Sequence, residues 1–436
     1  MPCGPSLGMP MIAGMFDRRH VRWTLIALWL LAGCSLSVTP EPLPTRSGSA
    51  RPQQTAGFAH QVCESDPFGC VEIADGDPIL LGTALTLTGP DAATGLDSQY
   101  GAQVALNLRG SVPGHEVELV NHDDRCGPDG GTAAASLLTE LDGLVAVIGT
   151  SCSSAAGPAA ALLGERGILL VSPSNTAPRL TPDGASESFY ARIAPNDATQ
   201  GRAMAQFACT ELAVATAATI GDGSAYAEAL QEAFALEFAS QCDGTLTQRA
   251  DVTDGASVDA VLEQIATSNE GAAPELLYYP LANEVGTAVA RRAARTPGLE
   301  EVILAGIQLG EDGTPTPEML DGTYLSAPTL VPTGDFYESS FLDEYRSVSA
   351  HDDPIGAFHG QAYDAVNLVL DAVVDAAIEE EGVLYIPRSA LREAVMASQA
   401  YEGLTGTITC SANGDCGNAT ITVSLVEDGA LNPVWP

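Results

Sequence analysis

Residues 148–158 read IGTSCSSAAGP, in which three serines and a cysteine follow an apolar stretch and precede a run of small residues. A serine or cysteine at a strand-to-helix turn can act as a nucleophile, because such a turn exposes the side chain above a sheet. The same turn can instead hold an anion, because the first N–H groups of a helix have no partner and carry partial positive charge. The stretch therefore predicts either a hydrolase nucleophile at Ser153 or Ser154, or an anion cradle that does no chemistry.

Other patterns for catalysis are weak. The tripeptide HDD at 122–124 and 351–353 could support acid–base chemistry, but histidine and aspartate at strand ends are more often satisfied loop residues. The GDG at 221–223 lacks the full spacing of a dinucleotide-binding loop. All 18 basic residues are arginine. This excludes a P-loop, a pyridoxal Schiff base and a Ser-x-x-Lys nucleophile, since each needs a lysine amine. We predict no cofactor and no metal.

The elements that must position these residues are short apolar strands alternating with amphipathic helices from residue 77 onward. LVAVIGT, for example, precedes SSAAGPAAALLGE, and a second series of the same kind begins near Pro195. This alternation is typical of parallel sheets with helices on both faces. The globular part, about 365 residues, exceeds one typical domain and predicts two similar α/β halves.

The last stretch, GTITCSANGDCGNATITVSLVEDG, has a different pattern. Two alternating β runs flank an Asn-Gly turn, which predicts a hairpin. Cys410 and Cys416 could staple that hairpin.

The N-terminal residues carry the marks of export. An arginine-rich stretch, DRRHVR, precedes the apolar run WTLIALWLLAGC, which is too short to span a membrane and ends in small residues before Cys34. The LLAGC ending resembles the lipobox of bacterial lipoproteins, in which the cysteine becomes a lipidated N-terminus; an ordinary signal peptide is the alternative. We expect residues 1–33 to be a lipoprotein signal peptide, with translation starting at Met1 or Met15. Residues 34–75 are expected to hold the lipidated Cys34 and a flexible tether.

Charge and cysteine content agree with an exported protein. A formal net charge of −38 repels nucleic acid and anionic membranes, so we predict no nucleic-acid partner and membrane contact through a lipid anchor alone. Apart from Cys3 and Cys34, the cysteines fall into near pairs, and an even number outside the cytoplasm favours disulfides over zinc. Their connectivity stays open at this point. These cysteines are Cys63, Cys70, Cys126, Cys152, Cys209, Cys242, Cys410 and Cys416.

Four motifs together resemble the leucine/isoleucine/valine-binding proteins, the type I periplasmic solute-binding family. In chain order they are LTLTGPDAATGLDSQYGAQVALN, VNHDDRCGP, VAVIGTSCSSAAGPAAALLGERGILLVSPSNTAPRLT and GAFHGQAYDAVNLVLDAV. The resemblance implies an α/β fold of two Rossmann-like lobes, each with a parallel central sheet, joined by a three-segment hinge. It assigns residues 76–195 and 330–405 to lobe 1, and residues 196–329 and 406–436 to lobe 2.

The resemblance also decides the question of the serine cluster in favour of the anion cradle. It implies that Ser153 binds the carboxylate of a ligand held between the lobes, with a backbone contact at Ser174 and a hydroxyl contact at Thr176. It pairs Cys126 with Cys152, so Cys152 is not a nucleophile. Hydroxyl groups and free helix N–H groups can hold a carboxylate without a basic residue. An N-cap role for Ser153 and ordinary turn chemistry at Thr176 are the alternatives.

The remaining ligand positions depart from the family pattern. Tyr226 matches a ligand-contacting tyrosine, whereas Thr94 replaces a tyrosine of the first lobe. The family's ammonium-binding glutamate falls near Ile307 and Gln308, where no carboxylate stands. The acids that could substitute for it are Glu284, Glu311 and Asp312. Neutral groups suit an amide, a hydroxy acid or a keto acid better than an ammonium, because an unpaired buried charge is costly. We therefore expect leucine, isoleucine and valine to bind weakly.

The function that the resemblance implies is the solute-binding component of an ABC importer, lipid-anchored outside the cytoplasm. Its partners are then a small amino-acid-like carboxylate and the permease subunits. Such a protein closes around its ligand and does no chemistry, so we expect no enzyme activity. A ligand-sensing module of a signalling system is the alternative function.

Overall fold

The computed structural model describes residues 57–182, 184–252, 255, 257–281, 284–308, 320–417 and 420–436. The predicted signal peptide, the lipidation site Cys34 and most of the tether lie outside these ranges, as do Glu311 and Asp312. In the part of the chain that is described, no helix combines the length and the apolar character needed to cross a membrane.

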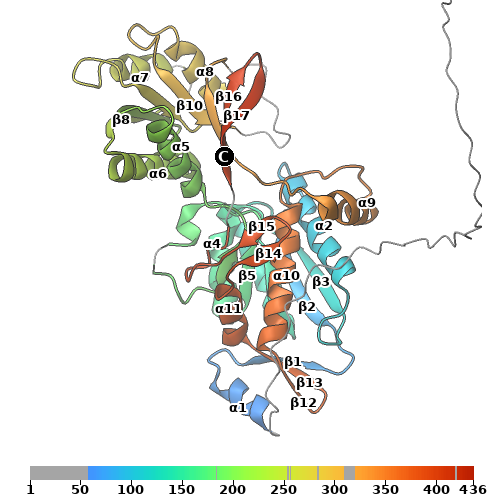
Figure 1. The fold of residues 1–436 in the computed structure, drawn as a ribbon. Helices are drawn as coiled ribbons and strands as arrows, with labels where there is room; N and C mark the ends of the chain where they lie inside the picture. Colours follow the sequence, from blue (N-terminus) through green and yellow to red (C-terminus); the bar gives the residue numbers. More distant parts are fainter. Residues whose placement is uncertain are drawn as a thin grey trace, which may run out of the picture. The chain divides into compact units, whose positions relative to one another are not determined.

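The first sheet has five parallel strands in the order β3-β2-β4-β5-β6. Figure 1 labels β2, β3 and β5 of this sheet. Strand β4 carries the apolar run predicted before the serine cluster, and all six of its residues are buried. Continuous burial is expected for a parallel strand covered on both faces. The strands are β2 (Ile79–Leu85), β3 (Val117–Asp123), β4 (Leu144–Gly149), β5 (Leu169–Ser172) and β6 (Tyr190–Arg192).

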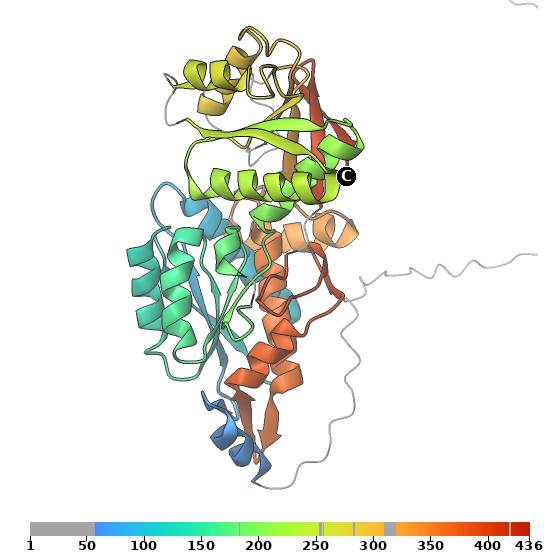
Figure 2. The ribbon, with the colours of Figure 1, turned by 90° about the vertical axis from the view of Figure 1, so that its left-hand side faces the viewer.

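Helices cover both faces of this sheet, as predicted. One core cluster joins strand residues to α2 and α10, and a second cluster joins the strands to α3 and α4. We call this sheet with its helices the first lobe (Figure 2). The helices are α2 (Ala92–Arg109), α3 (Pro128–Leu138), α4 (Ser153–Gly164), α9 (Leu342–Ser349), α10 (His359–Ala376) and α11 (Arg388–Met396), with short turns at η1 (Pro178–Leu180) and η2 (Tyr337–Phe341).

The second sheet has seven strands in the order β17-β16-β11-β10-β9-β7-β8. Its strands from β8 to β11 are parallel, whereas β16 and β17 run antiparallel at one edge. We call this sheet and its four helices the second lobe. The strands are β7 (Thr216–Gly221), β8 (Thr245–Asp251), β9 (Leu276–Tyr279), β10 (Ile303–Ile307), β11 (Tyr324–Pro328), β16 (Ile421–Glu427) and β17 (Ala430–Trp435), and the helices are α5 (Asp197–Thr210), α6 (Ala225–Cys242), α7 (Val258–Ile265) and α8 (Glu284–Ala293).

The expected tether is wrong over residues 57–75, which form an ordered addition before the first lobe. Strand β1 (Cys70–Ala74) pairs antiparallel with β13 (Val383–Pro387), which also pairs with β12 (Ile378–Glu380). Helix α1 (Phe58–Ser65) is fixed to this small sheet, because the backbone N–H groups of Gly57 and Ala59 donate to the Glu380 carboxylate.

The predicted hairpin near the C-terminus is wrong in its pairing. Strand β15 (Gly406–Ile408) pairs with β14 (Tyr401–Gly403), whereas β16 pairs with β11 and β17. The Asn-Gly turn lies instead in a loop closed by the disulfide between Cys410 and Cys416. Both cysteines are buried in the core cluster of the first lobe. The return to the second lobe therefore falls after residue 416, because the closed loop packs on the first lobe.

The chain passes between the sheets three times: after β6, after β11 and after β15. We call these the first, second and third crossing segments. The predicted disulfide content is confirmed for the described residues, and each near pair forms its own bond. The bonds are Cys63–Cys70, Cys126–Cys152, Cys209–Cys242 and Cys410–Cys416.

Candidate functional site

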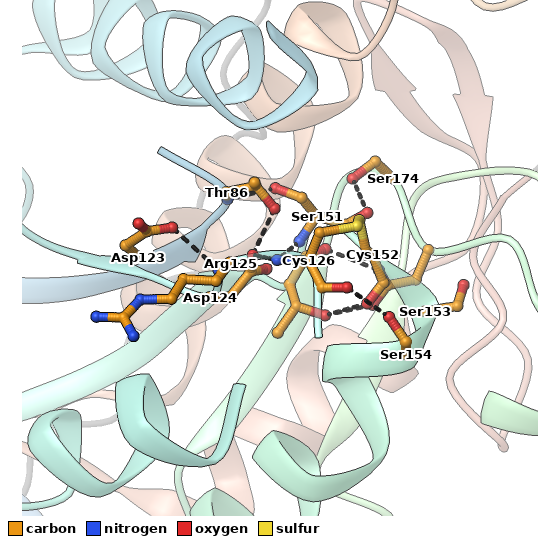
Figure 3. Close-up of a disulfide and its surroundings, with 12 residues drawn as sticks. Thr86, Asp123, Asp124, Arg125, Cys126, Ser151, Cys152, Ser153, Ser154 and Ser174 are labelled. Carbon is orange, nitrogen blue, oxygen red and sulfur yellow. Dashed lines mark hydrogen bonds between the residues drawn. A yellow bond between two sulfur atoms is a disulfide. The ribbon is translucent and has the colours of Figure 1, made fainter. Parts of the chain in front are cut away.

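The candidate site begins where strands β2, β4 and β5 end at one edge of the first sheet. Carboxyl ends of parallel strands meet at the same edge, which is where ligands bind in open α/β sheets. Thr86 follows β2, and its backbone N–H donates to the Ser151 hydroxyl after β4 at 2.9 Å. The Ser174 hydroxyl, after β5, donates to the Ser151 carbonyl at 2.9 Å. Figure 3 shows these three residues together.

Asp124, from the HDD tripeptide at 122–124, joins the loops at this edge through hydrogen bonds. It is fully buried, and its carboxylate accepts hydrogen bonds from the Thr86 hydroxyl at 2.5 Å and from the Ser151 N–H at 2.7 Å (Figure 3). The N–H of Cys126 also donates to it, at 2.9 Å. Burial raises the pKa of Asp124, against these hydrogen bonds, which lower it. Its hydrogen-bond partners are all donors, so Asp124 acts as a structural acceptor.

Ser153 is the first residue of α4, and Cys152 is the N-cap. The alternative of a plain N-cap role for Ser153 is therefore wrong. Its hydroxyl oxygen accepts the backbone N–H of Ala177 at 3.3 Å, which leaves the hydroxyl proton available to a ligand. The neighbouring Ser154 hydroxyl donates to the Cys126 carbonyl at 2.8 Å instead (Figure 3). The disulfide Cys126–Cys152 thus holds the start of α4 against the loop after β3.

The loop after β5 carries the other two predicted contacts. The N–H of Ser174 donates to the Ser172 hydroxyl at 3.2 Å, so its carbonyl is the backbone group left for a ligand. Asn175 is fully buried, and its side-chain amide donates to the Thr150 carbonyl at 2.8 Å. This bond ties the loop to the end of β4. Thr176 follows and is half-buried, with its side chain turned to the start of α5.

Asp197 is the acidic residue that the sequence-based prediction missed. It is the first residue of α5, is 7% exposed, and its N–H donates to the Thr176 carbonyl at 3.0 Å. Burial raises the pKa of Asp197 to about 7, against the hydrogen bond from the Thr176 side chain and the charge of Arg192. Among the described residues it forms no salt bridge. A buried carboxylate without a salt-bridge partner among the described residues therefore adjoins a predicted ligand contact.

The second lobe adds a polar chain beside Asp197. Tyr226 lies in the first turn of α6, and its hydroxyl donates to the Gln200 side-chain oxygen at 3.3 Å. Gln200, one turn after Asp197 in α5, donates to the Ser326 carbonyl at 2.8 Å. The backbone N–H of Gln308 donates to the same carbonyl at 3.0 Å. Burial and the charge of Asp197 raise the pKa of Tyr226, which places the phenol near that acid.

The structure brings Ser153, Ser174 and Thr176 together on the first lobe, and Tyr226 and Gln308 around Ser326 on the second. Thr94 lies in the first turn of α2, and its carbonyl accepts the Ser98 hydroxyl at 3.0 Å. The next residue, Gly95, packs against the backbone of Thr86.

The side chains predicted to substitute for the missing glutamate lie outside the described part of the chain. Glu284 begins α8, but its side chain is outside the described part of the chain, as are Glu311 and Asp312.

The alternative of a serine nucleophile lacks a base. Over the described residues, the hydroxyls of Ser153 and Ser154 have backbone partners, and no histidine or carboxylate is hydrogen-bonded to either. Nucleophilic serines need such a base at hydrogen-bond distance. The arrangement offers hydroxyl groups on one side and a carboxylate beside them.

Comparison with known proteins agrees with this geometry. Residues 78–430 match the periplasmic binding protein family, and the chain belongs to that family. A Leu/Ile/Val-binding protein homolog from Brucella melitensis is 28% identical over 361 residues, which cover 81% of this chain and 92% of that protein. The Leu/Ile/Val-binding protein of Escherichia coli is 30% identical over 173 residues, 38% of this chain and 46% of that protein.

The fold comparison extends over most of both chains. A putative branched-chain amino acid ABC transporter protein of known structure from Rhodospirillum rubrum superposes with a TM-score of 0.63 at 24% identity. The match covers 82% of this chain and 100% of that one, which establishes the two-lobed α/β fold. The family is one of solute-binding proteins that work outside the cytoplasm, and it is not an enzyme family.

Proposed function

We propose that this protein is the solute-binding component of an ABC importer and that it binds a small amino-acid-like solute between its two lobes. The observation that carries the proposal is the meeting of Ser153, Thr176 and Asp197 in a chain that matches the solute-binding family over residues 78–430. Hydroxyl and helix N–H donors suit a carboxylate, and a buried acid suits an ammonium. The proposal includes the permease subunits as partners and no chemical step.

The position of Asp197 removes the reason for expecting weak binding of leucine, isoleucine and valine. The weak binding expected for leucine, isoleucine and valine rested on the absence of an acid near Gln308. Asp197 supplies a carboxylate from a different element, next to Thr176 and Tyr226. We therefore propose that the ligand class includes zwitterions, and the relatives named above as Leu/Ile/Val-binding proteins support this class. Which side chain the ligand carries stays open.

A thermal-shift screen tests the proposal directly. Ligand at about 100 times its dissociation constant stabilises the folded state by roughly 2.7 kcal/mol, which is easily measured as a raised melting temperature. The screen uses the common amino acids, their 2-hydroxy analogues and simple carboxylates. No shift with any of these compounds would contradict the proposal. A signalling role is distinguished by the gene neighbourhood, since an importer component is expected beside permease genes.

The first prediction concerns the cradle. Replacing Ser153 by Ala, or Thr176 by Val, should each weaken a carboxylate ligand by about 1.5–3 kcal/mol, the usual size of a hydrogen bond to a charged group. Ser154→Ala is the matched control, because its hydroxyl already serves the Cys126 carbonyl. Isothermal titration calorimetry on the three variants measures the effect. Unchanged affinity in both cradle variants, or an equal loss in the control, would refute the assigned site.

The second prediction concerns the anchor. We propose that Cys34, which lies outside the described residues, is lipidated and holds the protein to a bacterial membrane. The wild-type protein should then sediment with membranes, whereas Cys34→Ala should appear in the soluble fraction or fail to localise. Cys3→Ala is the control, since Cys3 lies ahead of the apolar run. Equal recovery of wild type and Cys34→Ala with membranes would favour the ordinary signal peptide instead.

A further inference from the structure

A buried arginine joins the candidate site to the segments that connect the lobes. Arg192 is the last residue of β6 and is fully buried. Its Nη1 donates to the Ala177 carbonyl at 2.8 Å, in the loop that carries Thr176. Its Nη2 donates to the Thr181 hydroxyl at 2.6 Å, further along the same loop. The guanidinium therefore directly holds the loop after β5 that carries Ser174, Thr176 and Thr181, which we call the binding loop.

The partner charge comes from the third crossing segment. Asp415 accepts the Arg192 Nε at 3.1 Å and the Nη2 at 3.0 Å, one bond to each carboxylate oxygen. Asp415 lies inside the loop closed by Cys410 and Cys416. It also accepts the side-chain amide of Asn196, in the first crossing segment, at 2.8 Å. The Asp415 carboxylate thus links the third crossing segment, to which it belongs, with the first crossing segment and, through Arg192, with the binding loop.

Main-chain bonds fix this contact further. The N–H of Arg192 donates to the Gly414 carbonyl at 2.9 Å, and the N–H of Cys416 donates to the Arg192 carbonyl at 3.0 Å. The Asn413 amide also donates to the Thr181 carbonyl at 2.7 Å. The closed loop is therefore held to the strand on one side and to the binding loop on the other.

Both backbone polar groups of Ala177 are hydrogen-bonded. Its N–H donates to the Ser153 hydroxyl at 3.3 Å, and its carbonyl accepts Arg192 at 2.8 Å. The preceding Thr176 carbonyl accepts the Asp197 N–H at 3.0 Å. A bidentate carboxylate fixes the plane of a guanidinium, so Asp415 determines the direction in which Arg192 donates. The residue after Thr176 is thus linked, through Arg192, to Asp415, which lies 239 positions after Thr176 in the chain.

We propose that Asp415 and Arg192 are positioning residues that couple the third crossing segment to the ligand contact at Thr176. This inference rests on the proposed binding function. When the third crossing segment shifts during lobe movement, the direction in which the Arg192 guanidinium donates changes. The position of the Thr176 hydroxyl then changes with it. Conversely, a ligand that fixes Thr176 favours one arrangement of the crossing segments, because coupling between two sites is reciprocal.

The test uses the isosteric variant Asp415→Asn in the full chain. Affinity for the amino acid that gives the largest thermal shift in the screen should fall about tenfold. When Asp415→Asn is introduced into the Thr176→Val variant, affinity should change by less than twofold relative to Thr176→Val alone. The reason is that the hydroxyl through which Asp415 acts is already lost. Asp371→Asn is the matched control, since Asp371 pairs with Arg109 at 2.6 Å on the first lobe, away from the binding loop. It should leave affinity unchanged.

Hydrogen exchange provides a readout that needs no ligand. In Asp415→Asn, the amides of Ala177 and Asp197 should exchange at least about tenfold faster, whereas amides within β4 and β9 should not change. Additive affinity losses in the double variant, or unchanged exchange at Ala177, would overturn the coupling. If no screened compound binds the wild-type protein, the proposed function fails, and the exchange experiment alone then decides the positioning role.

Discussion

Asp197→Asn is expected to weaken binding of an amino acid by about 2 kcal/mol or more, roughly thirtyfold, the usual cost of removing one partner of a buried charge pair. The reason is that Asp197 is 7% exposed and forms no salt bridge among the described residues, where only the more distant charge of Arg192 acts on it, so we expect a ligand ammonium to be its direct counter-charge. Asparagine keeps the shape of the side chain and removes its charge. Calorimetry with the amino acid selected by the screen measures the loss.

A matched ligand separates this effect from general damage to the site. The 2-hydroxy acid with the same side chain keeps the carboxylate and lacks the ammonium. Its affinity should change by less than about threefold between wild type and Asp197→Asn, because the hydroxyl needs no charged partner. Ser153→Ala should weaken both compounds alike. An equal loss for both compounds in Asp197→Asn would assign the residue to loop structure and restore the expectation that zwitterions bind weakly.

Amino-acid affinity is also expected to fall steeply below neutral pH. The pKa of Asp197 is about 7 in the ligand-free protein, and an ammonium beside the carboxylate lowers it. Above pH 7 the acid is already ionised and affinity is constant. Below pH 7 the acid must lose its proton before it can pair, so affinity falls by up to about tenfold per pH unit until the lowered pKa is reached. Over about two units this amounts to roughly 100-fold.

Proton release gives the same prediction a second measure. Calorimetry at about pH 6 in buffers of different ionisation enthalpy should show close to one proton released per amino acid bound, and none for the 2-hydroxy acid. Asp197→Asn should remove both the release and the pH dependence. The amino acid itself remains a zwitterion across this window, so the ligand contributes no proton. Equal affinities at pH 6 and pH 8 in the wild type would contradict the assignment of the ammonium to Asp197.

The sequence by itself determined the class of fold. The apolar run of β4, the small residues of α4 and the alternation that follows are local features, and they predict a parallel α/β architecture with helices on both faces. The near pairs of cysteines are also local, and each forms its own disulfide. The family resemblance assigns Ser153, Ser174 and Thr176 together, and their meeting is consistent with parallel strands that end at one edge of the sheet.

Strand partners near the C-terminus were decided by tertiary structure. An alternating pattern shows that a segment is half-buried but not which strand it joins, so the Asn-Gly turn predicted a hairpin that does not form. Strand β16 instead extends the second sheet beside β11 and pairs with β17.

The charged groups of the site were decided in the same way. Asp197 follows Pro195 and an N-cap asparagine, where an acid ordinarily only favours the helix dipole. It lies beside Thr176 only because the first crossing segment brings the start of α5 to the loop after β5, where the Asp197 N–H donates to the Thr176 carbonyl. Arg192 and Asp415 are 223 residues apart and meet only because the third crossing segment returns to β6. Local patterns carry no information on such pairs, because a buried charge takes the partner that packing brings to it.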